Sequence, residues 1–142
     1  MLLVAGVLEL GRGYGYAIAT SDAARDGARY IAGKTALTDG PGLGSMCSLI
    51  TADLKAVTTN VSCPPTLVAH APPFVSGTDF TNPTGGQAVI VVYCGTSLNC
   101  MGTANPRYQS EIDVYVYFGF NDLNLFGGRI TISGSSKTTT SW

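Results

Sequence analysis

Few side chains in this sequence have the chemistry that a catalytic site needs. His70 is the single histidine among 142 residues, and Asp79 is its one neighbouring carboxylate along the chain. We interpret His70 as a surface or packed histidine, because acid–base catalysis needs a second positioned group. Glu111 and Asp113 alternate along one face of an expected strand, which is typical of a solvated face.

Two glycine-rich pieces, at residues 11–15 and 40–44, do not have the features of a phosphate-binding loop. Neither is followed by the Lys-Ser/Thr pair that such a loop uses, and neither follows an expected strand. The sequence therefore predicts a protein that is not an enzyme and that takes no cofactor, no metal and no small-molecule substrate.

The four cysteines, Cys47, Cys63, Cys94 and Cys100, lie in a region rich in Thr, Gly and Pro. An even count in such a region predicts two disulfides in an oxidising compartment. Of the three pairings that four cysteines allow, we favour the local ones, Cys47–Cys63 and Cys94–Cys100. Buried free thiols are the alternative, whereas a zinc site is disfavoured because there is no C-x-x-C pair.

Charge is scarce in this chain. Only 12% of residues are charged, against roughly 25% in an ordinary soluble domain, and the formal net charge is -1. This balance gives no field that would attract nucleic acid. Hydrophobic residues make up 45%, which excludes a disordered tail. A polar but nearly uncharged surface suits a protein packed against copies of itself.

The chain opens on an apolar segment, Met1–Leu10, that we expect to continue as a helix to about Ala32, with Gly33 as its stop. Its eight purely apolar residues are too few to cross a bilayer, which needs about 20. No basic region or small-residue cleavage site marks a secretory signal. The sequence reads as though it begins partway through a hydrophobic helix.

Several glycines interrupt this expected helix, and each costs about 1 kcal/mol relative to Ala. Gly11, Gly15 and Ala19 follow one another at i, i+4 spacing, which is the pattern of small residues that lets helices approach closely. We therefore expect the helix to pack against like helices. The alternative is that it lies on its own domain.

Glu9 interrupts the apolar segment and needs a partner if it is buried. Arg12 is one turn away in the same helix, and the Arg12 of a neighbouring copy or a free α-amino group would serve between helices. We interpret the pair as one that sets register in a bundle of identical helices. The alternative is a hydrated Glu9 at a membrane–water boundary.

The rest of the chain predicts a small sheet. A short helix is expected from Ser45 to Val57, followed by strands at 57–61, 88–93, 111–120 and 129–136. The proline-rich segment 63–87 is expected to be an irregular surface loop. Asn60 begins an Asn-x-Ser triplet, a weak signal for N-glycosylation.

These elements predict an α+β fold, in which a long N-terminal hydrophobic helix precedes a short helix packed on a small antiparallel sheet. We expect an assembly or membrane helix over residues 1–33 and a disulfide-containing, β-rich outer domain over residues 34–142.

Two stretches of the sequence resemble the TadE-like proteins of tight-adherence pili. The N-terminal stretch contains Glu9-Leu10-Gly11-Arg12 and the Ala-Ala-Arg-Asp-Gly-Ala-Arg run at residues 23–29. The second is a strand (DVYVYFGF), a short connection (LNLFGG) and a final strand (ITISGSS). The resemblance implies a pilin-like or pseudopilin-like subunit, cleaved from a precursor, anchored in the inner membrane and then extruded into an extracellular filament.

Together these observations predict the structural subunit of a homopolymeric surface filament, serving adhesion, with the membrane as its partner before assembly and no nucleic acid. The alternatives are a minor pseudopilin or tip adaptor and a single-pass, membrane-anchored extracytoplasmic binding module. The residues expected at the assembly interface are Leu2, Leu3, Val4, Val7, Leu8, Glu9, Gly11, Arg12, Gly15 and Ala19.

Overall fold

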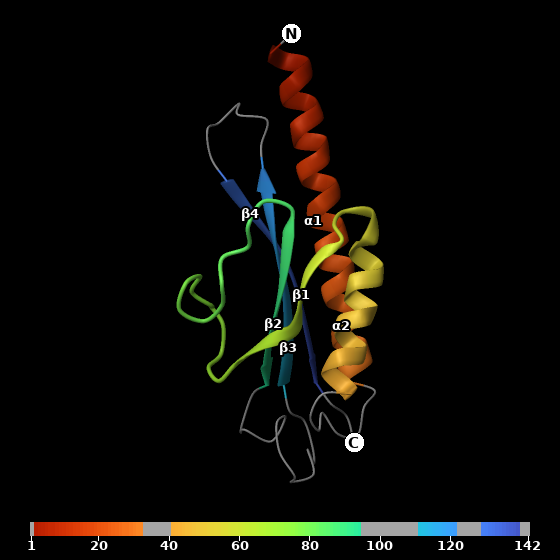
Figure 1. The fold of residues 1–142 in the computed structure, drawn as a ribbon, viewed down its shortest axis with the longest axis vertical. Helices are drawn as coiled ribbons and strands as arrows, with labels where there is room; N and C mark the ends of the chain where they lie inside the picture. Colours follow the sequence, from red (N-terminus) through yellow and green to blue (C-terminus); the bar gives the residue numbers. More distant parts are fainter. Residues whose placement is uncertain (1, 33–40, 95–110, 122–128, 140–142) are drawn as a thin grey trace.

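Two helices cover one face of a four-stranded sheet (Figure 1). The computed structural model describes residues 2–32, 41–94, 111–121 and 129–139. Helix α1 spans Leu2–Ala32, α2 spans Pro41–Asp53, and a short 3₁₀ turn, η1, spans Leu54–Ala56. The strands are β1 (Asn60–Val68), β2 (Gln87–Cys94), β3 (Glu111–Asn121) and β4 (Arg129–Thr139).

The sheet is mixed, with the strand order β1-β2-β3-β4. Strand β1 pairs parallel with β2, whereas β2–β3 and β3–β4 are antiparallel. The expectation of a wholly antiparallel sheet is therefore wrong for one strand pair. Strands β1 and β2 are parallel because the segment 69–86 carries the chain back to the end of the sheet at which β1 began. A tight hairpin would instead have made the two strands antiparallel.

Strand β1 begins later than expected and includes residues 63–68, which the sequence placed in an irregular loop. The register shifts between Ser62 and Thr66, so the intervening Cys-Pro-Pro lies in an irregularity of the strand. Proline has no N–H to donate and is confined to edge strands and bulges. The strand is at the edge of the sheet, so the irregularity at its prolines leaves the pairing of β2 with β3 intact.

The main core lies between the helices and the sheet. Ile112, Val114 and Val116 of β3 are buried against it, which confirms the expected alternation along this strand. Helix α1 contributes small residues to the core and so approaches α2 closely. A Cβ atom built on Gly27 would come within 2.6 Å of the Ile50 side chain. The remaining helix residues of this core include Ala23, Ala24, Ala28, Ile31, Met46 and Leu54.

The opposite face of the sheet is not the solvated face that the sequence predicted. Phe80 stacks on Tyr117 with ring centroids 4.2 Å apart, and Phe74 meets the edge of Tyr115 at 5.0 Å. Asp113, on the same face, is only 4% exposed. The prediction failed because the proline-rich segment supplies aromatic residues that cover this face.

The disulfide Cys47–Cys63 is confirmed; it joins α2 to β1 with a Cα–Cα distance of 6.1 Å. The second expected pair falls outside the description, because Cys100 is not among the described residues and the side chain of Cys94 is not described. Helix α2 begins at Pro41 rather than near Ser45, since proline is well suited to the first helical position. The fold class is confirmed: a long helix and a short helix on a four-stranded sheet form a pilin-like α+β arrangement.

Candidate assembly interface

Helix α1 divides into a projecting N-terminal half, residues 2–18, and a packed C-terminal half, residues 19–32. The C-terminal half lies along the sheet, whereas the N-terminal half extends beyond the end of α2 (Figure 1). Leu3 is 84% exposed and Leu10 is 76% exposed. Contiguous exposed apolar side chains mark an interaction surface on a soluble protein. The other large apolar side chains exposed on this half are Val4, Val7, Leu8, Tyr14 and Ile18.

The glycines of the projecting half have no packing role within the described chain. A Cβ atom built on Gly11 or Gly15 would meet nothing within 4 Å, and the same holds for Gly6 and Gly13. Gly27, in the packed half, is different because a side chain there would collide with Ile50. Glycine destabilises a helix interior by roughly 0.5–1 kcal/mol relative to Ala. Four such positions weaken α1 without improving any contact among the described residues.

Arg12 holds the projecting half at the point where α1 leaves the sheet. Its Nη1 lies 3.4 Å from Oε1 of Glu9, and its Nη2 donates to the hydroxyl of Tyr16 at 3.4 Å. The guanidinium lies 5.8 Å from the ring centroid of Phe120, within the range of a cation–π contact. Glu9 is only 6% exposed, and its Oε2 atom has no hydrogen-bond partner among the described residues. The intrahelical partner expected for Glu9 is therefore present.

Most of the residues expected at the interface lie on the exposed surface of the projecting half. Leu3, Val4, Val7, Leu8, Gly11, Arg12 and Gly15 are exposed, whereas Glu9 is buried. Ala19 differs, because it is partly buried and packs against the main core. The side chain of Leu2 is not described.

Three exposed apolar residues of this half were missing from the expected interface: Leu10, Tyr14 and Ile18. Ile18 continues the spacing of three and four residues that runs from Val4 through Gly11, so this spacing could have predicted its exposure.

The surface of α1 changes from apolar to charged along its length. On the packed half the exposed positions carry two ion pairs, Arg25–Asp22 at 3.6 Å and Arg29–Asp26 at 3.8 Å. Asp53 at the end of α2 lies near the same acidic residues. Its pKa is raised by partial burial and, to a smaller extent, by the charges of Asp26 and Asp22.

His70 and Asp79 link two parts of the proline-rich segment, and we call this pair the clasp. Its Nε2 lies 2.9 Å from Oδ1 of Asp79, and its Nδ1 lies 2.9 Å from the carbonyl oxygen of Ala71. Both partners are oxygen acceptors, so the ring donates to both of them only in its protonated form. The bond to Asp79, followed by the one to Ala71, raises the pKa of His70.

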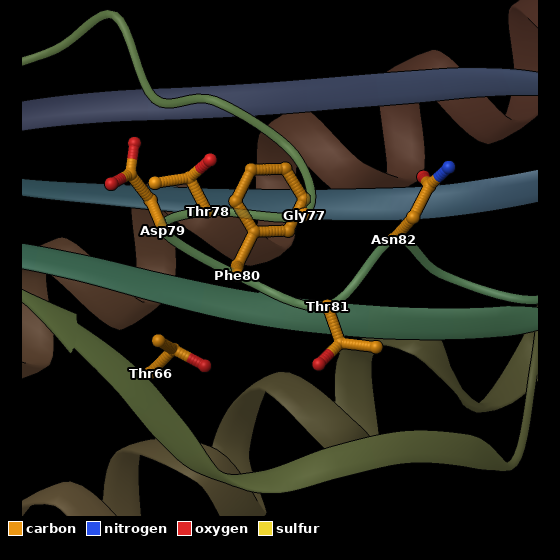
Figure 2. Close-up of a pocket in the computed structure, with 7 residues that line it drawn as sticks. All are labelled: Thr66, Gly77, Thr78, Asp79, Phe80, Thr81 and Asn82. Atoms are coloured by element: carbon orange, nitrogen blue, oxygen red, sulfur yellow. The ribbon is translucent and has the colours of Figure 1, made fainter.

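A pocket of about 370 Å³ lies beside this clasp. Figure 2 shows that its lining comes from Thr66 on β1 and from the loop residues 77–82. Both carboxylate oxygens of Asp79 are already used, one by His70 and one by the backbone N–H of Val75. The pocket therefore presents hydroxyl groups and one amide but no free charged group.

Within the described ranges, no three His, Cys, Asp or Glu side chains are grouped so that they could hold a metal ion. No helix in the same ranges combines the length and the apolar character needed to cross a lipid bilayer. Asn60, of the expected glycosylation triplet, is exposed at the start of β1.

The comparisons with known proteins leave the family open: no family model, curated protein or solved structure matches this chain.

Proposed function

We propose that this chain is a structural subunit of an extracellular pilus-like filament, assembled by packing the projecting halves of α1 from neighbouring copies. The observation that carries the proposal is the exposed apolar surface of residues 3–18, in a pilin-like fold whose own core leaves that surface uncovered. Each large apolar side chain that becomes buried contributes about 1.5–3 kcal/mol before ordering costs. Seven large apolar side chains are exposed on residues 3–18, so their burial would give a large driving force for association.

The glycines with open space around them favour close packing between two helices rather than a nonspecific hydrophobic contact. Gly11 and Gly15 lower the helix surface, so that a neighbouring helix can approach with close backbone contact. Within one copy these residues only weaken the helix. Their cost to the stability of the helix is offset when a second helix packs into the notch, the shallow depression that Gly11 and Gly15 leave on the helix surface.

In this proposal the projecting half is held in the inner membrane before assembly and moves into the filament core afterwards. The sheet and the proline-rich segment then coat the fibre at the cell surface, where the role is adhesion. No turnover of a substrate is part of this function. The contact of Arg12 with the Phe120 ring joins the middle of the projecting half to β3, and the ion pair with Glu9 orients the guanidinium for it.

Paired valine substitutions in the full chain test the proposal. Val7 on α1 is 68% exposed and Val75 in the proline-rich segment is 57% exposed, so Val7→Gln and Val75→Gln make matched changes at two exposed sites. We expect Val7→Gln to reduce the fibres sheared from cells and Val75→Gln to leave them unchanged. Electron microscopy counts the fibres, and mass spectrometry identifies their main band.

The same preparations separate the alternatives. Fibres whose main band is another protein, with this chain in a few copies, would assign it as a minor pseudopilin or tip adaptor. Detergent-soluble monomers with no fibres would assign it as a membrane-anchored binding module. An equal effect of the two valine substitutions would contradict packing through α1.

A further inference from the structure

Another pocket, of about 310 Å³, lies between the sheet and the proline-rich segment. It is at the end of the sheet where β3 begins and β4 ends, away from the projecting half of α1 (Figure 1). Pockets of this size are typical of small-molecule sites. The residues that matter for its chemistry are Pro72, Glu111, Asp113, Tyr115, Ser135 and Lys137, all of which line it.

Asp113 lines this pocket although it is almost closed to water. It is only 4% exposed, and its Oδ1 atom has no hydrogen-bond partner among the described residues. Buried polar atoms nearly always have a partner, and an unpaired one costs stability. The last torsion of an aspartate is broad and two-fold, so the carboxylate can turn either oxygen toward the pocket. A ligand that donates a hydrogen bond there would supply the missing partner.

The strand register places a cation beside this carboxylate. Lys137 is directly opposite Asp113 in the antiparallel pair of β3 and β4, a position where Cβ atoms are about 4.5–5.5 Å apart. Its Nζ atom nevertheless lies 2.5 Å from Oε1 of Glu111. An ammonium group has three N–H donors, so Lys137 can donate to a ligand as well as to Glu111. The pocket therefore offers an acceptor at Asp113 and a donor at Lys137.

The charges of these three side chains favour a neutral ligand. A metal ion would be attracted by Glu111 and Asp113 but repelled by the ammonium of Lys137, whereas an anion would be repelled by the two carboxylates. A neutral molecule with adjacent hydroxyl groups avoids both conflicts. One hydroxyl can donate to Asp113 while its neighbour accepts from Lys137, because each hydroxyl is both a donor and an acceptor.

Apolar surface lies next to these polar groups. Tyr115 and Pro72 line the pocket, and Phe74 supports the Tyr115 ring at a centroid distance of 5.0 Å. Ser135, directly opposite Tyr115 in the register, adds a further hydroxyl. Small-molecule sites commonly combine an apolar lining with a few placed polar groups. A sugar ring has the matching character, with C–H groups on its faces and hydroxyls around its edge.

We propose that this pocket binds a neutral sugar unit, whose adjacent hydroxyls donate to Asp113 and accept from Lys137 while its ring packs against Tyr115 and Pro72. The sugar is bound without being converted. Use of the site in adhesion rests on the proposed function, in which the sheet and the proline-rich segment coat the fibre. Binding itself needs only the single chain.

Saturation-transfer difference NMR on the full chain tests the site. A zwitterionic detergent without a sugar headgroup keeps the apolar part of α1 covered. The probes are the methyl glycosides of glucose, galactose and mannose, with those of glucosamine and glucuronic acid as charged analogues of the glucoside. We expect saturation transfer to at least one neutral glycoside, and we expect neither charged analogue to bind more tightly than the glucoside. Transfer to no neutral glycoside, or tighter binding of a charged analogue, would overturn the proposal.

Asp113→Asn separates binding from folding. The substitution keeps the shape of the side chain and should weaken binding of the neutral glycoside about tenfold, because hydrogen bonds to charged groups are about twice as strong as neutral ones. The matched control is Asp22→Asn, which removes a carboxylate that is 60% exposed on α1 and should leave binding unchanged. Thermal denaturation checks that both variants are folded. Unchanged binding by Asp113→Asn, or an equal loss in Asp22→Asn, would contradict the assigned site.

Lys137→Met tests the donor on the other side of the ligand. The substitution keeps an unbranched side chain but removes the N–H groups, so it should weaken binding about threefold to tenfold, the size expected for one hydrogen bond. Unchanged binding would show that Lys137 does not contact the sugar and would overturn the arrangement proposed here.

The outcomes separate this site from the proposed function. Fibres that form from a chain that binds no neutral glycoside would overturn the sugar site and leave filament assembly in place. Glycoside binding by a chain that forms no fibres would support the sugar site and contradict the proposed function. Asp113→Asn should leave fibre yield unchanged, because the pocket lies away from the projecting half of α1.

Discussion

Gly134 of β4 lies directly against the backbone of Thr20 in α1: a Cβ atom built on Gly134 would come within 2.3 Å of the Thr20 carbonyl carbon. This contact seats the packed half of α1 on the sheet. Gly134→Ala should destabilise the fold by about 1–3 kcal/mol, because backbone atoms on both sides must separate. Thermal or urea denaturation measures the change. An unaltered midpoint would show that α1 is not held at this contact.

Gly15→Leu should have opposite effects on the single chain and on the fibre. Leu is the better helix former and meets open space at residue 15, so the free subunit should gain roughly 0.5–1 kcal/mol. The same side chain fills the notch and should reduce fibre yield. Gly44→Leu is the matched control, since Gly44 is also an exposed helical glycine with open space but lies on α2. Equal fibre yields from the two variants would contradict a role for the notch.

Asp113→Asn should stabilise the protein at neutral pH. Burial first, and the charge of Glu111 second, raise the pKa of Asp113, and its Oδ1 atom has no hydrogen-bond partner among the described residues. The folded chain therefore holds this proton to a higher pH than the unfolded chain. Stability should fall as pH rises from about 3.8 through the raised pKa, and then become constant.

Removing the charge should raise the free energy of unfolding by about 1 kcal/mol at pH 7. The gain should disappear below about pH 3.8, where both states are protonated. Denaturation of the two proteins at the two pH values measures it. A gain of equal size at both would show that the Asp113 charge is not its source.

His70→Phe should open the proline-rich segment in acid but have little effect in base. Because the pKa of His70 is raised by Asp79, its contribution is complete below the unfolded value of about 6.5 and is lost as pH rises through the folded pKa. The pKa of Asp79 is lowered, first by the Val75 N–H and then by His70. Hydrogen exchange of residues 74–80 at pH 5 and pH 9 measures the clasp. Equal protection at both pH values in the unsubstituted chain would argue against it.

The helix and the strand pattern of this fold could be predicted because each appears as a regular spacing of apolar residues within a short stretch of sequence. The alternation of Ile112, Val114 and Val116 identified the buried face of β3, and the local disulfide Cys47–Cys63 was also correct. The parallel pairing of β1 could not be predicted, because it depends on where the proline-rich segment returns the chain. The burial of Asp113 has the same cause.

The exposed surface of the candidate interface was predictable only in part. Apolar residues at the start of the helix indicated an assembly surface, and Leu3 and Val7 are indeed exposed. The sequence does not show which glycines have a packing role. Gly15 and Gly27 belong to one series of i, i+4 positions, yet Gly27 packs on Ile50 whereas Gly15 meets open space. That difference depends on where α2 ends relative to α1.

Helical reconstruction of sheared fibres by cryo-electron microscopy tests assembly through α1 most directly. The expected map has the projecting halves of α1 packed together along the fibre axis, with Leu3 and Val7 buried between copies and the sheets outside. A map in which the sheets make the contacts between subunits and these two side chains stay in solvent would contradict the proposed function.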